Sequence, residues 1–164
     1  MPMTPFFERF PELGPAETRS VKVTGAPDLP DGEYGFFELY CNEPGCDCRR
    51  ATILVLRPET GWRKVWATIS YGWESLEFYR KWAPSQDPRE MQGASLDTLN
   101  AQSPYSSALL ELFRTVLRSP GYVDRLKRHY QMFRASADQA TRHEINRVQN
   151  RRAKLRDLKR RSKR

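Results

Sequence analysis

All three cysteines of this 164-residue chain lie in one short segment between two runs that are typical of β-strands. Residues 34–41 (YGFFELYC) alternate between two faces, and residues 51–56 (ATILVL) are apolar throughout, as in a buried strand. A turn over 58–61 leads to a third strand-like run over 64–71. The pattern predicts an antiparallel meander whose first connection carries every thiol in the chain.

Helical periodicity follows the meander. Residues 73–82 and 105–118 are expected to be helices, whereas residues 83–104 lack periodicity and are expected to form a loop. A further helix over 121–134 would bury one stripe of side chains: Tyr122, Leu126, His129, Tyr130 and Phe133.

Together these elements predict an α+β fold: a small antiparallel sheet, a meander of three to four strands, packed with helices, plus a basic C-terminal helix. Residues 20–24 would add an edge strand. The expected domains are a proline-rich arm over 1–17 that docks on the body through its phenylalanines, an α+β body over 18–135 and a basic helical tail over 136–164.

The positive charge is concentrated in the tail. Residues 140–164 contain eleven Lys and Arg against two Asp and Glu, a net charge of +9, while residues 1–139 contain seventeen against eighteen. Such a basic segment favours polyanions, so we expect the tail to bind nucleic acid or an acidic protein, with phosphate contacts that do not read sequence. The alternative is a solvated tail without a partner. The candidate contacts are Arg147, Arg151, Arg152, Lys154, Arg156, Lys159, Arg160 and Arg161.

The cysteine spacing suits a zinc ion. Cys46 and Cys48 are two residues apart, so their side chains point the same way in an extended segment, and the Pro44-Gly45 turn can bring them back to Cys41. Three thiolates that converge in this way are the usual ligands of a structural zinc site. The sequence therefore predicts a body that zinc stabilises.

A structural zinc site needs a fourth ligand. His129 is the better candidate because it lies on the apolar stripe of its helix, whereas His143 lies in the basic tail. Three thiolates, one neutral imidazole and Zn²⁺ leave a net charge of −1, which Arg49 and Arg50 would offset while donating N–H bonds to sulfur.

Three other interpretations of the cysteines stay open. They could be buried as small apolar side chains, or act as a redox pair with a spare thiol. With water as the fourth ligand, the site would be an open, catalytic zinc centre, with Glu43 or Asp47 as the nearby acid or base. The chain contains no HExxH, deaminase, P-loop or dinucleotide-binding motif, so no motif favours an enzyme.

Several runs resemble those of a widespread group of uncharacterised bacterial proteins: YGFFELYC, CDCRR, GWESLEFY, SPYSSALLELF and RLKRHYQMF. The resemblance spans about residues 32–133 and includes all three cysteines and His129. The group has no established activity, so the resemblance implies a shared site but no mechanism. The Cys46–Cys48 pair also resembles part of the SEC-C metal-binding motif, whose closing pair is missing here.

The sequence lacks the signals of export and of membrane insertion. No run approaches about 18 consecutive apolar residues, and the first ten residues lack the charged-then-apolar order of a signal peptide. An odd number of cysteines fits a reducing cytoplasm. The leading hypothesis is a cytoplasmic, non-enzymatic zinc protein with a polyanion-binding tail; the second is a metal-dependent enzyme of unknown substrate.

Overall fold

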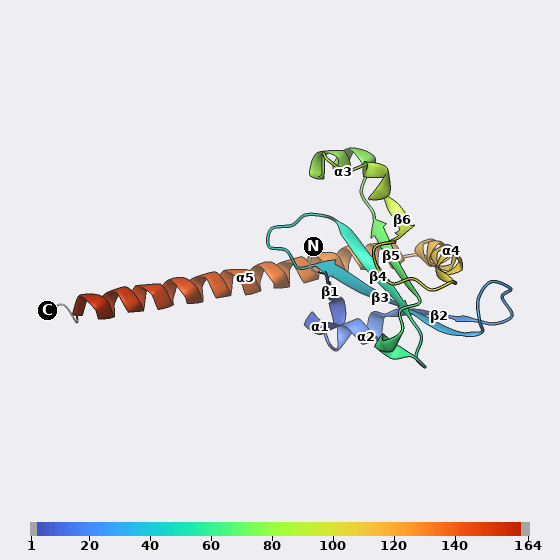
Figure 1. Cartoon of the computed structure of the whole chain (residues 1–164), viewed down its shortest axis with the longest axis horizontal. Coiled ribbons are helices and arrows are strands. Elements are labelled where there is room, and N and C mark those ends of the chain that lie inside the picture. The colour runs from blue at the N-terminus through green and yellow to red at the C-terminus, as the bar shows by residue number, and fades with distance from the viewer. Residues whose placement is uncertain (1–2, 162–164) are drawn as a thin grey trace.

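The computed structural model describes the main chain of residues 3–161 and the side chains as far as Lys154. Six antiparallel strands form one sheet in the order β1-β3-β4-β5-β6, and β2 pairs with the remaining length of β3 (Figure 1). The α+β fold class is confirmed. The strands are β1 (Met3–Pro5), β2 (Arg19–Val23), β3 (Gly32–Cys41), β4 (Arg50–Leu56), β5 (Ala67–Gly72) and β6 (Gly93–Leu96).

The helices are mostly short, and one is very long. The expected helix over 73–82 is limited to its last seven residues because the Ser75 hydroxyl caps it by accepting from the Phe78 N–H. The helical elements are α1 (Phe6–Arg9), α2 (Leu13–Glu17), η1 (Gly61–Arg63), α3 (Leu76–Trp82), η2 (Pro88–Glu90), α4 (Ser106–Leu117) and α5 (Tyr122–Arg161).

One face of the sheet carries the core. The register pairs Glu38 with Ile53 and Ile53 with Ile69, and this face packs against α4 and α5. Phe113 of α4 contacts Phe36 at a ring-centroid distance of 5.6 Å, and Phe133 of α5 lies as close to Tyr40. The predicted inward stripe of the last helix is confirmed, since all five of its side chains are buried. The core therefore fixes α5 to the strand that ends at Cys41.

The opposite face of the sheet is only partly covered. The side chains of Leu39, Thr52 and Ser70 share it, because the register pairs Leu39 with Thr52 and Thr52 with Ser70. Cys41 and Arg50 are the next residues along β3 and β4 on this face. Cys41 thus lies on the face opposite Glu38, where its side chain is fully buried.

The predicted proline-rich arm over 1–17 contains regular elements in its described residues. It forms β1, α1 and α2, and Phe6 is buried against the body, as expected of a docked arm. Gly14 allows α2 to lie against Phe7, since a Cβ at this position would come within 2.5 Å of the Phe7 Cβ.

The segment over 83–104 is not simply a loop. It contains η2 and β6, and β6 extends the sheet by pairing Leu96 with Ile69. All four residues of β6 are half-buried, so no alternation marks the strand in the sequence. Its pairing with β5 depends on a contact between distant segments, which short-range patterns do not report.

Helix α5 has 40 residues, a length of about 60 Å, and leaves the body after its first half (Figure 1). It crosses the predicted boundary between residues 135 and 136 without a break. Ala137 is its last buried residue among those whose side chains are described, and every residue from 142 to 154 is exposed. Across residues 3–161, no helix combines the length and apolar character needed to cross a bilayer.

Candidate metal centre

The structure brings the three cysteines together. Cys41 ends β3, and Cys46 and Cys48 lie in the connection to β4, with the three Sγ atoms within 4.8 Å of one another. The predicted turn forms: Gly45 has a φ of 70°, and the Cys46 N–H donates to the Glu43 carbonyl at 3.2 Å. Tetrahedral zinc with Zn–S bonds of about 2.3 Å places its sulfurs about 3.8 Å apart, so the cluster needs only a small contraction to bind the ion.

A backbone N–H from the residue two positions further along the chain lowers the pKa of each thiol. The Glu43 N–H donates to the Cys41 Sγ at 3.4 Å, and the backbone N–H groups of Cys48 and Arg50 act to lower the pKa of Cys46 and of Cys48. Burial raises the pKa of all three thiols, and these N–H bonds oppose that rise. Such donors stabilise thiolates, which are the form that binds a metal. The loop could therefore hold a metal ion through three sulfurs, and all three cysteines are free of disulfides.

Two tyrosine hydroxyls hold the loop where it returns to β4. The Arg49 N–H donates to the Tyr130 hydroxyl at 3.2 Å, and the Tyr79 hydroxyl donates to the Arg49 carbonyl at 2.9 Å. Arg49 has a φ of 49°, a left-handed conformation that is uncommon for a residue with a side chain. These bonds fix the sharp change of direction between Cys48 and β4.

Arg134 of α5 anchors the other end of the loop. Its buried guanidinium donates to the carbonyls of Cys41 and Glu43, both at 2.9 Å, and pairs with Asp138 at 2.6 Å. Sequence reasoning missed this residue. The available signal was its spacing, since it lies four residues after Tyr130 on the inward side of the helix.

The two arginines after the cysteines differ from each other. The Arg49 guanidinium pairs with Asp47 at 3.0 Å and Glu74 at 3.5 Å, and it lies over the Phe78 ring. The Arg50 side chain donates to Ser70 Oγ at 2.6 Å. Neither arginine side chain donates to a sulfur among the described residues, which corrects the expectation; the Arg50 main-chain N–H instead acts to lower the pKa of Cys48.

His129 is not part of this cluster, and the prediction of a fourth ligand at this position is corrected. Its Nδ1 lies 2.7 Å from Glu38 Oε2, and its Nε2 lies 2.7 Å from Glu17 Oε2. Glu38 and Cys41 point to opposite faces of β3, so a histidine that packs on the core face meets the carboxylate. Both ring nitrogens are engaged by carboxylates.

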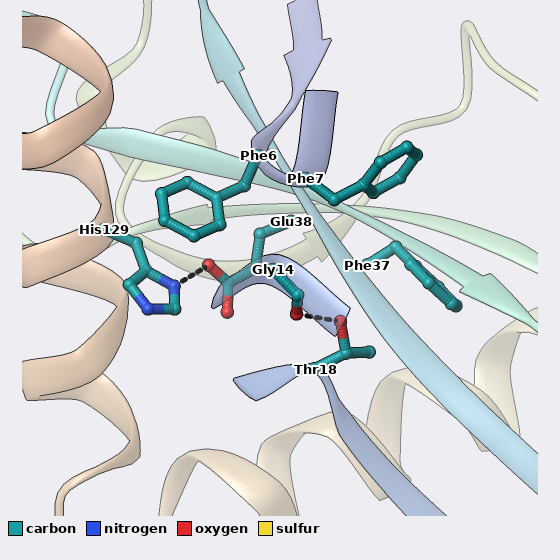
Figure 2. Close-up of a pocket in the computed structure, with 7 residues that line it drawn as sticks. All are labelled: Phe6, Phe7, Gly14, Thr18, Phe37, Glu38 and His129. Carbon is teal, nitrogen blue, oxygen red and sulfur yellow. Dashed lines mark hydrogen bonds and ion pairs between the residues drawn. The ribbon is translucent and has the colours of Figure 1, made fainter. Parts of the chain in front are cut away.

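The surroundings of His129 are closed. The Phe6 ring stacks on the imidazole at a centroid distance of 4.1 Å, and Figure 2 shows Glu38 pointing toward His129 beside Phe6. Burial raises the pKa of Glu17. Its bond to His129 and the charge of Arg128 lower the pKa by a larger amount, so the net shift is downward. The neighbouring cavity has a volume of about 10 Å³, which is room for one water molecule. This cluster is a structural contact between the arm and α5.

Within residues 3–154, no fourth Cys, His, Asp or Glu joins the three sulfurs. Asp47 is instead paired with Arg49, and Glu43 and His143 are exposed. Cys41 and Cys48 line a groove of about 670 Å³ on the open face of the sheet. The far side of this groove is formed by the segment over 86–100. This segment can approach β5 closely because Gly72 has no side chain: a Cβ there would come within 2.1 Å of the Met91 carbonyl. The three-sulfur cluster therefore borders a hollow of ligand size.

The predicted polyanion contacts of α5 are exposed where the structure describes them. Arg147, Arg151, Arg152 and Lys154 all face solvent. The side chains of Arg156, Lys159, Arg160 and Arg161 lie outside the described residues. Glu144, 3.6 Å from Arg147, is the one acidic residue between positions 142 and 154.

Comparisons with protein-family models, curated proteins and solved structures found no match for this chain.

Proposed function

We propose that this protein binds zinc through Cys41, Cys46 and Cys48, and that its helix α5 binds nucleic acid by contacts with the phosphate backbone. We further propose that it does so in the cytoplasm, where free thiols persist, and that it shares the zinc site with the bacterial group it resembles. The single observation that supports the nucleic-acid proposal most strongly is the exposure of every α5 residue from 142 to 154. If this part of the helix packed against its own chain, at least one of its faces would be buried.

Charge and length support the same partner. Residues 142–161 contain nine Lys and Arg against two Asp and Glu, and as a helix they span about 30 Å. Basic side chains surround most of this helix. It therefore lacks the arrangement in which one face docks in the groove of a partner protein and the charged residues lie on the other face. Phosphates along a nucleic-acid strand offer a partner of matching length and opposite charge.

The metal loop and the helix belong to one assembly. Tyr130 and Arg134 hold the cysteine loop, and both lie on α5 shortly before it leaves the body. A metal-bound loop would therefore fix the base of the helix and set its direction. Zinc has a structural role in this proposal, since it orders the body from which the basic helix extends.

The test is the salt dependence of nucleic-acid binding by the full chain. Replacing Arg147, Arg151, Arg152 and Lys154 by glutamine should weaken binding to DNA and to RNA alike. The slope of log K against log salt is negative, and it should become less steep by about 0.9 for each lost phosphate contact. The matched control changes four exposed cations of the body to glutamine: Lys22, Arg63, Arg80 and Lys81. Equal loss in both variants, or an unchanged slope in the helix variant, would contradict the proposal.

A second function is favoured because no fourth protein ligand joins the cysteines among the residues whose side chains the structure describes. An open metal position next to a groove is the arrangement of a catalytic centre, with the fourth position available to water or substrate. The test is cobalt substitution of the full chain, because the visible absorption of thiolate-bound Co²⁺ reports its ligands. Added azide should change that spectrum if the fourth position is open to the groove, and should leave it unchanged if the site is closed.

A further inference from the structure

The groove beside the cysteines contains a guanidinium without an acidic partner. Arg50 lines the groove together with Cys41, Cys48 and Ser70. No carboxylate of the described residues lies within ion-pair distance of it, and its one side-chain bond is to Ser70 Oγ. Its Nε is buried and makes no hydrogen bond to any acceptor in the described chain, sulfur included. A buried donor without an acceptor is uncommon in native structures and asks for a ligand or water.

The adjacent residue shows what a satisfied arginine looks like in the same loop. Arg49 has two carboxylate partners and an aromatic ring beneath its guanidinium, and it lies on the outside of the turn. Arg50 lies on the open face of the sheet, where Thr52 and Ser70 supply hydroxyl groups and no charge. Arg9 and Arg125 also have a buried Nε without an acceptor, so what sets Arg50 apart is its place beside the three cysteines in the lining of the groove.

We infer that the groove binds a small molecule with a single carboxylate, which Arg50 holds next to the metal position. The position of this ligand next to a metal rests on the proposed open metal site. Its anchoring by Arg50 rests on the contacts described above. A carboxylate can accept two N–H groups of one guanidinium, which satisfies donors that the chain leaves unmatched. A groove of about 670 Å³ accommodates a molecule of this kind.

The acidic residues of the groove select for one negative charge. Asp97 accepts from the Leu99 N–H and the Asn100 amide, and Glu90 is exposed at the edge. Both would repel a phosphate dianion more strongly than a carboxylate monoanion, and so would a metal bound by three thiolates. A monocarboxylate carries just enough charge to pair with Arg50.

The experiment measures carboxylate binding by calorimetry on the full chain, in zinc-loaded and chelator-treated samples of known metal content. The probes are benzoate and acetate, with inorganic phosphate at matched ionic strength. Benzoate should bind saturably and more tightly than phosphate. Arg50→Gln should weaken benzoate binding about 10-fold to 100-fold, as expected for loss of charge-assisted hydrogen bonds. The matched control, Arg49→Gln, should bind benzoate as the unmodified chain does.

The two samples separate the ligand site from the metal site. If the chain retains no zinc but binds benzoate, and Arg50→Gln still weakens that binding, the metal proposal fails and the carboxylate site stands. If zinc is bound and neither carboxylate binds, or if Arg50→Gln binds benzoate unchanged, the carboxylate site is overturned. Phosphate binding as tight as benzoate binding would likewise overturn it.

Discussion

Two polar clusters lie on opposite faces of β3, and α5 contacts both through consecutive residues, His129 and Tyr130. The His129 cluster is complete: its nitrogens face two carboxylates, and Phe6 covers the ring. The cysteine cluster has three sulfurs within 4.8 Å of one another but no fourth ligand among the described residues, and it opens to a groove. Complete satisfaction marks a contact that holds the fold together, and incomplete satisfaction next to open space marks a site for something from outside.

The largest expected effect tests the closed cluster. His129→Ala leaves the buried Glu38 carboxylate with the Tyr40 hydroxyl as its remaining donor and no cationic partner, so the free energy of unfolding should decrease by about 3–5 kcal/mol. Urea unfolding measures this loss. Metal content per folded chain should stay unchanged, because His129 does not reach the cysteines. Loss of metal from a folded His129→Ala variant would reinstate the histidine as a ligand.

Cys48→Ser tests the open cluster. A structural zinc ion stabilises the folded state by about 3–4 kcal/mol when its free concentration exceeds the dissociation constant 100-fold to 1,000-fold. The variant should lose a similar amount of unfolding free energy together with its metal. Chelator should lower the melting temperature of the unmodified chain and leave that of Cys48→Ser unchanged. A chelator effect of equal size on both proteins would contradict the assignment.

Glu17→Gln tests the contact between the arm and α5 by its pH dependence. The pKa of Glu17 is lowered from its ordinary value of 4.5 in the folded protein, so ionised Glu17 contributes stability above pH 4.5. That contribution disappears as the pH falls through the lower folded value. The variant should therefore be less stable by about 1 kcal/mol at pH 6, and the two proteins should converge toward pH 3. The exposed Glu12 of the same arm, changed to Gln, is the control and should show no such convergence.

The smallest expected effect on stability belongs to the outer half of α5. Replacing Arg147, Arg151, Arg152 and Lys154 by glutamine removes no buried contact, so the unfolding free energy should change by less than about 0.5 kcal/mol. Thermal melting in moderate salt measures it. A loss of several kcal/mol would show that this half of the helix packs on another surface in solution.

Local patterns account for the meander, the cysteine turn and the inward stripe of α5, because strand alternation and helical spacing are properties of neighbouring residues. The partners of His129 could not be predicted in the same way, since Glu38 and Glu17 lie 91 and 112 residues away in the sequence. Its position on the inward stripe was predicted correctly, but spacing alone does not say which face of β3 the helix covers. Strand β6 and the anchoring role of Arg134 likewise depend on contacts between distant segments.

The account depends most directly on a metal at the three cysteines. The decisive measurement is the zinc content of full-length protein purified without chelator, combined with the rate at which its native thiols react with a colorimetric thiol reagent. We predict one zinc per chain and three thiols that react slowly until a chelator removes the ion, and then quickly. A folded, metal-free protein whose three thiols react at the same rate with and without chelator would contradict it.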